Sequence, residues 1–316
     1  MSNLSFLIVD ICILSLQVIT STSNGCILFL FFKVKKLRRG SGFRLLLFLS
    51  CTDFLHAVTT IPYIIYLTTH WHPANIQLDP YFVMLSSIPL TIQLKVNLTL
   101  TISIAFERAL ALFLPVAYRR FPTSTYSWSC LAIGCLLAAL DVTLEFLLSP
   151  FNKSPNCAAI GCFVSSEFRY YWGTSNMVMG ILVILLTVVL IVKLRIFEAE
   201  SQSRRITTDR DSSNFNQANR STAGILLSSL IFVTIPSVGV GFVEMLGYSI
   251  FKRVGPFYIV GLLCAGACNA IIYVALNRDM RNLAKSCILR VDPAGRTIMT
   301  STKIFSTSKF HAQENH

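Results

Sequence analysis

Several ionisable side chains lie inside apolar stretches of this chain, where a charge is costly. Lys95 stands within residues 90–121, and Asp141, Glu145 and Glu244 lie in apolar runs further along. An ammonium group in such surroundings needs an acidic partner or a ligand. Two interpretations stay open. Either Lys95 pairs permanently with one of the three carboxylates, or it meets an anionic or polar ligand that comes from outside.

The stretch around Lys95 alternates between apolar and polar residues, a pattern typical of a half-buried strand. On a helix with about 100° per residue, the same polar residues form two stripes on nearly opposite sides. One stripe holds Lys95, Thr99 and Ser103, and the other holds Gln93, Asn97 and Thr101. A helix that is polar on two sides has no broad apolar face for lipid, so we expect it at the centre of a bundle. Gln93 joins Lys95 and the three acids as a candidate ligand-binding residue.

Three further polar residues lie in separate apolar runs: Asn24, Asp53 and Asn269. Polar groups buried in lipid must find partners, so these residues are candidates for one network with water or a sodium ion. His70 and His72 are too few for a metal site, and no metal or other cofactor is expected. Neither H-E-x-x-H nor G-x-S-x-G occurs, so catalytic residues are not expected.

The composition and the length of the apolar runs predict which helices carry these residues. Of 316 residues, 53% are hydrophobic and 13% are charged, against about 25% charged in soluble domains. Apolar runs long enough to cross about 30 Å of hydrocarbon as helices recur along the chain. They cover about 5–32, 45–69, 83–114, 127–149, 174–197, 223–249 and 257–276. We predict an all-α membrane protein with a seven-transmembrane helix bundle.

The basic residues predict the orientation of the bundle. Most of the 27 lysines and arginines follow the first, third, fifth and seventh runs, whereas Lys153, Arg169, Lys252 and Arg253 lie on the other side. Positive residues stay in the cytoplasm, which places the N-terminus outside. The net charge of +12 is therefore a topology signal, and nucleic acid is not an expected partner.

Two kinds of modification are expected on the extracellular side. The sequons at Asn3 and Asn152 fall outside and are candidates for glycosylation. Cys157 and Cys162 lie close together in an outer connection, in an oxidising space. A disulfide between them and a pair of free thiols are both compatible with the sequence.

After the last run, residues 277–290 place apolar side chains on one face of a helix and basic ones elsewhere. This pattern predicts a short amphipathic eighth helix on the membrane surface, with Cys287 as a candidate for palmitoylation. A solvated tail helix is the alternative. Residues 1–290 would form the bundle with this helix, and residues 291–316 a flexible cytoplasmic tail.

The third run ends in Glu107-Arg108 and continues as 109-ALALFLPVAYRRF-121. This resembles the inner end of the third helix of G-protein-coupled receptors, whose motif is Asp/Glu-Arg-Tyr. Further matches in the other runs are Asn24, Asp53, Trp128, Pro236 and the sequence from Asn269 to Tyr273, with Ala270 in place of a proline. The resemblance implies that Glu107 holds Arg108 at rest, that Arg108 meets the G protein in the active state, and that Asn269 and Tyr273 belong to the switch.

The departures from the common receptor pattern are informative too. No cysteine stands near the outer end of the third run, and the last run has no lysine for retinal. Short loops and the pattern Glu-Arg-x-x-Ala-x-x-x-Pro-x-x-Tyr-Arg are similar to the nematode serpentine chemoreceptors of the class BC (Srbc) type.

These features predict a chemoreceptor that binds an extracellular small molecule and activates a heterotrimeric G protein through a basic surface that includes Arg119 and Arg120. Lipid-headgroup anchoring is the alternative role of these two arginines. The expected location is the plasma membrane of sensory cilia, in contact with lipid, and both homo- and hetero-oligomers are compatible with the sequence. The alternative function is a transporter or channel that uses Lys95, Asp141 and Glu145 in translocation.

Overall fold

The structure, a computed structural model, describes residues 3–33, 44–73, 76–155, 157, 159–203, 210–248, 256–277 and 280–282. Within these ranges the regular secondary structure is helical and no strand occurs. In the part of the chain that the structure describes, seven helical segments are long and apolar enough to cross a membrane. The prediction of an all-α bundle of seven transmembrane segments is confirmed, and the alternating stretch around Lys95 is a helix.

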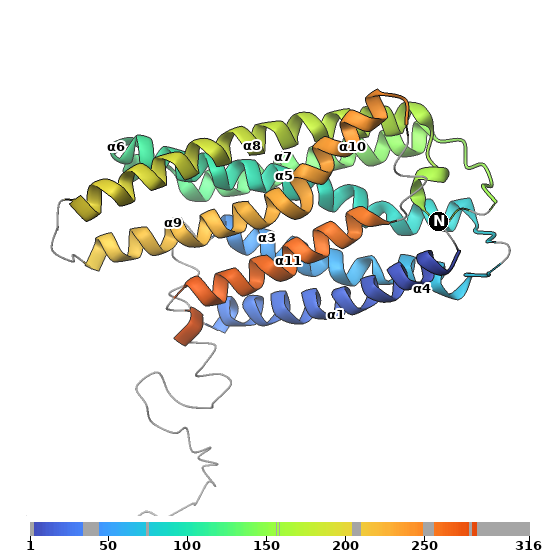
Figure 1. The fold of residues 1–316 in the computed structure, drawn as a ribbon, viewed down its shortest axis with the longest axis horizontal. Helices are drawn as coiled ribbons and strands as arrows, with labels where there is room; N and C mark the ends of the chain where they lie inside the picture. The colour runs from blue at the N-terminus through green and yellow to red at the C-terminus, as the bar shows by residue number, and fades with distance from the viewer. Residues whose placement is uncertain are drawn as a thin grey trace, which may run out of the picture.

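The segments lie side by side along the long axis of the bundle in Figure 1. The first four comprise α1 Asn3–Lys33, α3 Arg44–Thr59 with α4 Ile61–Thr69, α5 Pro80–Phe113 and α7 Thr123–Leu148. The fifth is α8 Ser166–Ser203. The sixth comprises α9 Arg210–Ser229, the π-helical turn η3 Leu230–Thr234 and α10 Ile235–Met245, and the seventh is α11 Phe257–Leu276. Two short helices lie between segments: α6 Pro115–Arg120 and the 3-10 helix η2 Ile160–Cys162.

Prolines mark the first turns of several helices, where a missing N–H costs little. Pro80 stands at the first turn of α5, behind Asp79, whose side chain accepts a hydrogen bond from the N–H of Tyr81. In the sixth segment Pro236 directly follows the π-helical turn, and Figure 1 shows α10 bending away from the axis of α9 at this point. The bend beside Pro236 therefore coincides with an irregular backbone.

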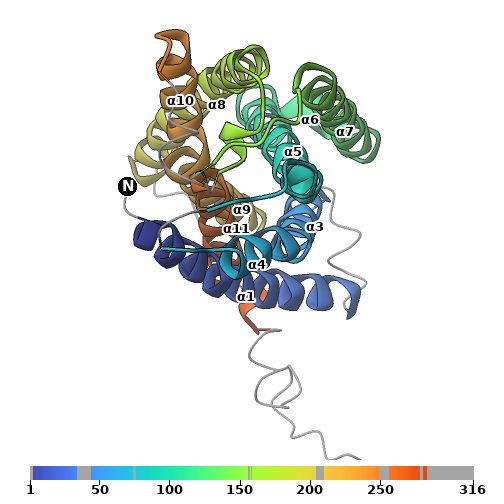
Figure 2. The ribbon, with the colours of Figure 1, turned by 90° about the vertical axis from the view of Figure 1, so that its right-hand side faces the viewer.

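Helix α5 is the central helix of the bundle, as predicted from its two polar stripes. It is the most buried of the seven segments and packs against α3, α7, α8 and α9. The view along the bundle in Figure 2 places α5 between α3, α7 and α8. Each polar stripe therefore meets protein instead of lipid.

The apolar core is divided into two clusters, and α5 contributes to both. The outer cluster includes Tyr63, Met84, Leu94, Phe163 and Tyr258, and the inner cluster includes Phe31, Val96, Leu100, Leu226 and Tyr273. Lys95 stands between Leu94 and Val96, where the outer cluster meets the inner one. Its charge therefore lies deep in the packed bundle, at the inner limit of the outer half.

The fifth segment is longer than predicted at both ends. Hydropathy placed it at 174–197, whereas α8 already begins at Ser166 because its charged first turns are helical too. The predicted outer connection is correspondingly shorter. Of the expected eighth helix, only residues 280–282 are described, and they are helical. Cys287 and the tail 291–316 lie outside the described residues.

Candidate functional site

Lys95 is buried between three helices and contacts both an acid and a hydroxyl group. Its Nζ lies 3.1 Å from Asp141 Oδ2 on α7 and donates a hydrogen bond of 2.9 Å to Ser175 Oγ on α8. The other carboxylate oxygen of Asp141 accepts a bond of 3.0 Å from the hydroxyl of Tyr171. Since both charges are only 1% exposed, loss of one would leave the other buried and unpaired. This pair links α5 to α7 and α8.

The second polar stripe of α5 meets a different acid. Gln93 Nε2 and Asn97 Nδ2 donate hydrogen bonds of 2.9 and 3.5 Å to Asp53 Oδ1 on α3. Gln93 thus has its partner on α3, whereas Lys95 has its partners on α7 and α8. The structure does not bring these two candidate ligand-binding residues together.

The predicted inner network is arranged around α11. Asn24 Nδ2 donates to the carbonyl oxygens of Thr20 and Gly266, at 3.1 and 3.2 Å. Gly266 in turn packs against Asp53, because a Cβ atom at this glycine would lie 3.1 Å from Asp53 Cγ. Asn269, one turn further along α11, accepts a hydrogen bond from Ser228 on α9. Asn24 and Asp53 therefore lie against the stretch of α11 that also carries Asn269.

Glu145 lies one turn from Asp141 on α7 and does not pair with Lys95. Its Oε2 accepts a hydrogen bond of 2.8 Å from Thr91 on α5, and its Oε1 has no hydrogen-bond partner among the described residues. Glu145 lines a cavity of about 20 Å³. The other lining residues are Leu90, Thr91, Ile160, Gly161, Val164, Phe168, Arg169 and Trp172. This cavity lies in the outer half of the bundle.

Glu244 is engaged by Arg169, to which the sequence analysis assigned no role beyond orientation. Arg169 Nε lies 3.9 Å from Glu244 Oε2, and its Nη1 donates to the carbonyl oxygens of Gly161 and Val164 at 2.9 and 2.6 Å. One guanidinium group thus joins α8, α10 and the connection before α8. The only signal in the sequence was a charged residue directly before the fifth apolar run.

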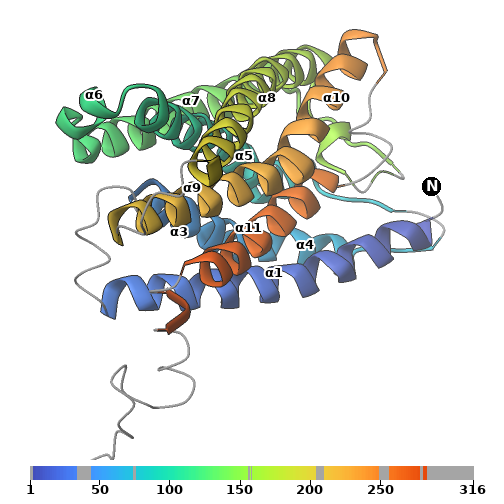
Figure 3. The same ribbon diagram turned by 60° about the vertical axis from the view of Figure 1, so that its left-hand side comes forward.

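The connection between α7 and α8 covers the outer end of the bundle, and we refer to residues 150–165 as the lid. Cys157 and Cys162 form a disulfide within it. Phe163 and Val164 are buried in the outer core cluster, and the N–H of Ser165 donates to Ser149 Oγ at 3.2 Å. Figure 3 shows the lid in light green at one end of the bundle and α6 at the opposite end.

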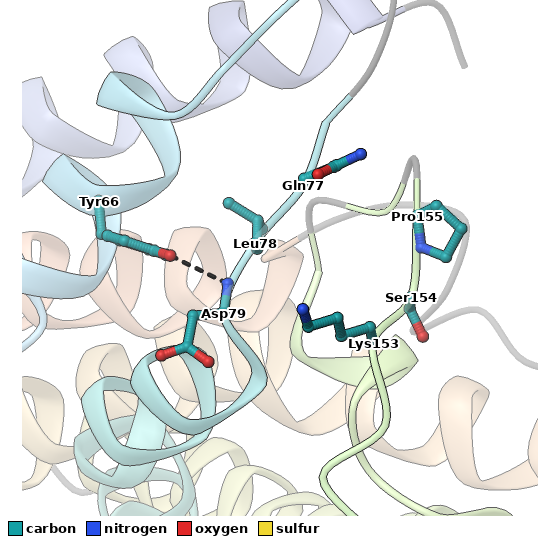
Figure 4. A pocket seen from close by; sticks show the side chains of 7 residues that line it. All are labelled: Tyr66, Gln77, Leu78, Asp79, Lys153, Ser154 and Pro155. Carbon is teal, nitrogen blue, oxygen red and sulfur yellow. Dashed lines mark hydrogen bonds between the residues drawn. The ribbon is translucent and has the colours of Figure 1, made fainter.

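A larger hollow opens beside the lid, between it and the connection before α5 (Figure 4). Its volume is about 570 Å³, and it is lined by Tyr66, Gln77, Leu78, Asp79, Lys153, Ser154 and Pro155. The hydroxyl of Tyr66 accepts a hydrogen bond of 3.0 Å from the N–H of Asp79. With Asp79 and Lys153 exposed on its wall, this hollow is large enough for a small polar molecule. The sequence analysis did not identify it.

At the cytoplasmic end of α5, Glu107 contacts two side chains. Its Oε1 lies 4.0 Å from Arg108 Nη2 and accepts a hydrogen bond of 2.9 Å from the hydroxyl of Tyr118 on α6. Burial, together with the negative charge of Glu107, raises the pKa of Tyr118 to about 12, so this hydroxyl stays protonated and keeps donating. The sequence analysis gave Tyr118 no role.

Comparison with known protein families shows to which family the chain belongs. A family model described as "Serpentine type 7TM GPCR chemoreceptor Srbc" matches residues 1–279, which include all seven transmembrane segments. The chain belongs to this chemoreceptor family. The resemblance inferred from the Glu107-Arg108 region is thereby confirmed. Among curated proteins, none matches the chain.

Three further residues of the predicted switch and G-protein surface of the chemoreceptor lie within the described residues. Tyr273 is buried and stacks on Phe31 with ring centroids 5.7 Å apart. Arg119 and Arg120 are exposed at the end of α6, on the same side of the bundle as Arg108. Both arginines are therefore accessible to a partner or to lipid headgroups.

The two predicted glycosylation sites of the chemoreceptor lie in different elements. Asn152 is exposed at the start of the lid. Asn3 is the first residue of α1. Glycosylation at both positions remains a prediction.

Proposed function

We propose that this chemoreceptor binds a small extracellular molecule and, in response, activates a heterotrimeric G protein at the plasma membrane. The observation that carries the proposal is that α5 connects two polar centres. Its outer half holds Lys95 and Thr91, which contact acids of α7, and its inner end holds Glu107 and Arg108. A shift of one helix would change both centres, as a receptor requires.

The ligand side of the proposal consists of the buried acids and bases under the lid. Lys95, Asp141, Glu145 and Glu244 all lie in the outer half, and Glu145 borders the small cavity. A cavity of about 20 Å³ holds no more than about one water molecule. A ligand would collect in the hollow beside Lys153 and displace the lid before it reaches these groups.

The G-protein side is closed by contacts that a conformational change would release. Tyr118 and Arg108 both approach the same oxygen of Glu107. The sixth segment carries its π-helical turn and Pro236 between the two ends, which provides a hinge. Activation would free Arg108 and, together with Arg119 and Arg120, present it to the G protein.

The direct test is ligand-dependent G-protein activation by the full chain in a heterologous cell, with candidate molecules applied outside. We expect Arg108→Ala to abolish activation at normal surface expression, and Arg195→Ala, which removes an exposed arginine from α8, to preserve it. Persistent signalling from Arg108→Ala would contradict the role of Arg108. Substrate flux through reconstituted vesicles without any G-protein activation would favour the transporter instead.

A further inference from the structure

The outer half of the bundle holds more buried acids than buried bases. Among the described residues, the buried acids at the level of Lys95 or further out are Asp10, Asp53, Asp141, Glu145 and Glu244, and the buried lysine and arginine are Lys95 and Arg169. Asp53 accepts hydrogen bonds from Gln93 and Asn97. Each base has its own acid, since Lys95 pairs with Asp141 and Arg169 pairs with Glu244. In the described ranges, no ion pair joins Asp10 or Glu145 to a base.

Of these two acids, Glu145 borders open space. Its side chain is 1% exposed, Thr91 occupies one carboxylate oxygen, and the other oxygen has no hydrogen-bond partner among the described residues. A buried carboxylate without a counter-charge is unfavourable, and a positively charged group beside it would relieve the cost. The cavity along which Glu145 lies is where such a group would sit.

The cavity wall also carries aromatic rings. Phe168 and Trp172 line it, and their rings stack with centroids 6.2 Å apart. Trp172 meets the ring of Tyr258 edge-on at 5.4 Å. Aromatic faces beside a carboxylate are the surroundings in which ammonium groups bind, because the ring quadrupole attracts a cation.

Arg169 also lines the cavity, and its charge has to be considered. Glu244 lies opposite its Nε, and two lid carbonyl oxygens accept from its Nη1. Arg169 is thus already matched by an acid and tied to the lid, whereas Glu145 is matched by none. Glu145 is therefore the acid at the cavity wall that no basic side chain pairs with in the described part of the chain.

We propose that the ligand of this receptor is a compact cation, an organic amine or a quaternary ammonium compound. Its charge binds Glu145, and its apolar part lies against Phe168 and Trp172. The proposal rests on the proposed receptor function and adds the class of ligand. Binding requires the lid residues Ile160, Gly161 and Val164, which close the cavity, to move outward.

The test uses the purified full chain in lipid nanodiscs and measures the thermal midpoint Tm with pairs of matched probes. Choline is compared with its neutral isostere 3,3-dimethylbutanol, and phenethylamine with 2-phenylethanol and phenylacetate. We expect at least one cation to raise Tm by about 2–4 °C at a hundred times its Kd, and its neutral and anionic counterparts to have no effect.

Two variants locate the effect. Glu145→Gln keeps the size of the side chain and the acceptor for Thr91, and it should weaken binding of the cation at least tenfold. Glu167→Gln removes an exposed acid from the same end of the receptor and should leave binding unchanged. The Tm of each variant without probe shows whether it is folded.

Several results would overturn the proposal. They are stabilisation by the neutral or anionic probes, absence of stabilisation by every cation, and unchanged cation binding in Glu145→Gln. The last result would mean that Glu145 is a protonated packing residue. Failure of the receptor function has a different signature, because the cation would then bind through Glu145 without activating any G protein in cells.

Discussion

The hydroxyl of Tyr118 on α6 donates a hydrogen bond of 2.9 Å to Glu107 at the end of α5. The same carboxylate oxygen lies 4.0 Å from Arg108. A tyrosine outside the transmembrane helix thus contacts the acid that we propose restrains the arginine. If that proposal holds, the resting state depends on α6 as well as on α5.

Tyr118→Phe should raise the activity of the receptor without ligand. The variant removes one hydrogen bond to a charged group, worth about 1.5–3 kcal/mol, and part of this stabilises the resting state. We expect basal nucleotide exchange on the G protein to increase by about two- to tenfold. Tyr81→Phe, which keeps an exposed aromatic ring at the outer end of α5, serves as the control. Equal basal activity in both variants would contradict the restraint.

The raised pKa of Tyr118 gives this restraint a defined pH range. Because the folded protein holds the proton more tightly than a free tyrosine does, the phenol stays protonated below about pH 10, and the folded state loses stability only as pH rises from about 10 toward 12. Basal activity should therefore show no titration from Tyr118 between pH 6 and 9. The measurement is basal exchange across this range, in wild type and Tyr118→Phe in parallel.

The Lys95–Asp141 pair should respond differently to single and double substitution. Lys95→Met or Asp141→Leu alone leaves a buried charge without its partner and should cost about 3–5 kcal/mol. Lys95→Met combined with Asp141→Leu should recover most of this loss. Surface expression and Tm of the three variants form the double-mutant cycle. A double variant as unstable as the sum of both single ones would mean that the two charges do not stabilise each other.

Ligand response separates the two interpretations of Lys95. If Lys95→Met, at reduced but measurable surface expression, keeps its response to ligand while Asp141→Asn loses surface expression, Lys95 only holds the bundle together. Loss of response in Lys95→Met at matched expression would make it part of the binding site.

The sequence predicted the helices and the sidedness of α5, because length, hydropathy and polar periodicity are local properties. It placed Lys95 and Gln93 on opposite stripes, and the structure gives them acids on different helices. It left the choice among Asp141, Glu145 and Glu244 open, and the first two lie on one face of α7 at similar depth. The relative axial position of α5 and α7 decides this choice, and no local pattern encodes it.

The contacts that the sequence did not predict involve residues at the ends of helices. Arg169 binds lid carbonyl oxygens that come together only when the lid folds, and Tyr118 reaches Glu107 only because α6 turns back at Pro115. Hydropathy placed both Arg169 and Tyr118 outside the membrane-spanning runs. Their contacts depend on how the connections between the helices fold, which hydropathy does not predict.

Opening the lid disulfide should weaken the cover over the outer cavity. Cys157 and Cys162 close a short loop, so the chain-entropy model gives a contribution of about 2 kcal/mol. We expect Cys157→Ser, Cys162→Ser and the double variant to increase proteolysis of the lid to the same extent. Cys12→Ser, which removes a free thiol from α1, is the control. Additive effects of the two single variants would indicate that the thiols act separately.

Close packing of α8 against α10 should make one glycine of the sixth segment far more sensitive than its neighbour. A Cβ atom at Gly241 would lie 2.5 Å from the carbonyl oxygen of Gly173 and 2.5 Å from Met177 Cβ, whereas one at Gly239 would meet nothing within 4 Å. Gly241→Ala must therefore push the helices apart and should destabilise the receptor by about 1–3 kcal/mol. Gly239→Ala should be neutral or stabilising by up to about 1 kcal/mol, because alanine favours the helix.

Thermal unfolding of both variants in the same detergent tests this contrast. Equal Tm values would show that α8 and α10 are not in close contact at their outer ends. Helix α10 would then not be held against α8 on the outer side of Pro236.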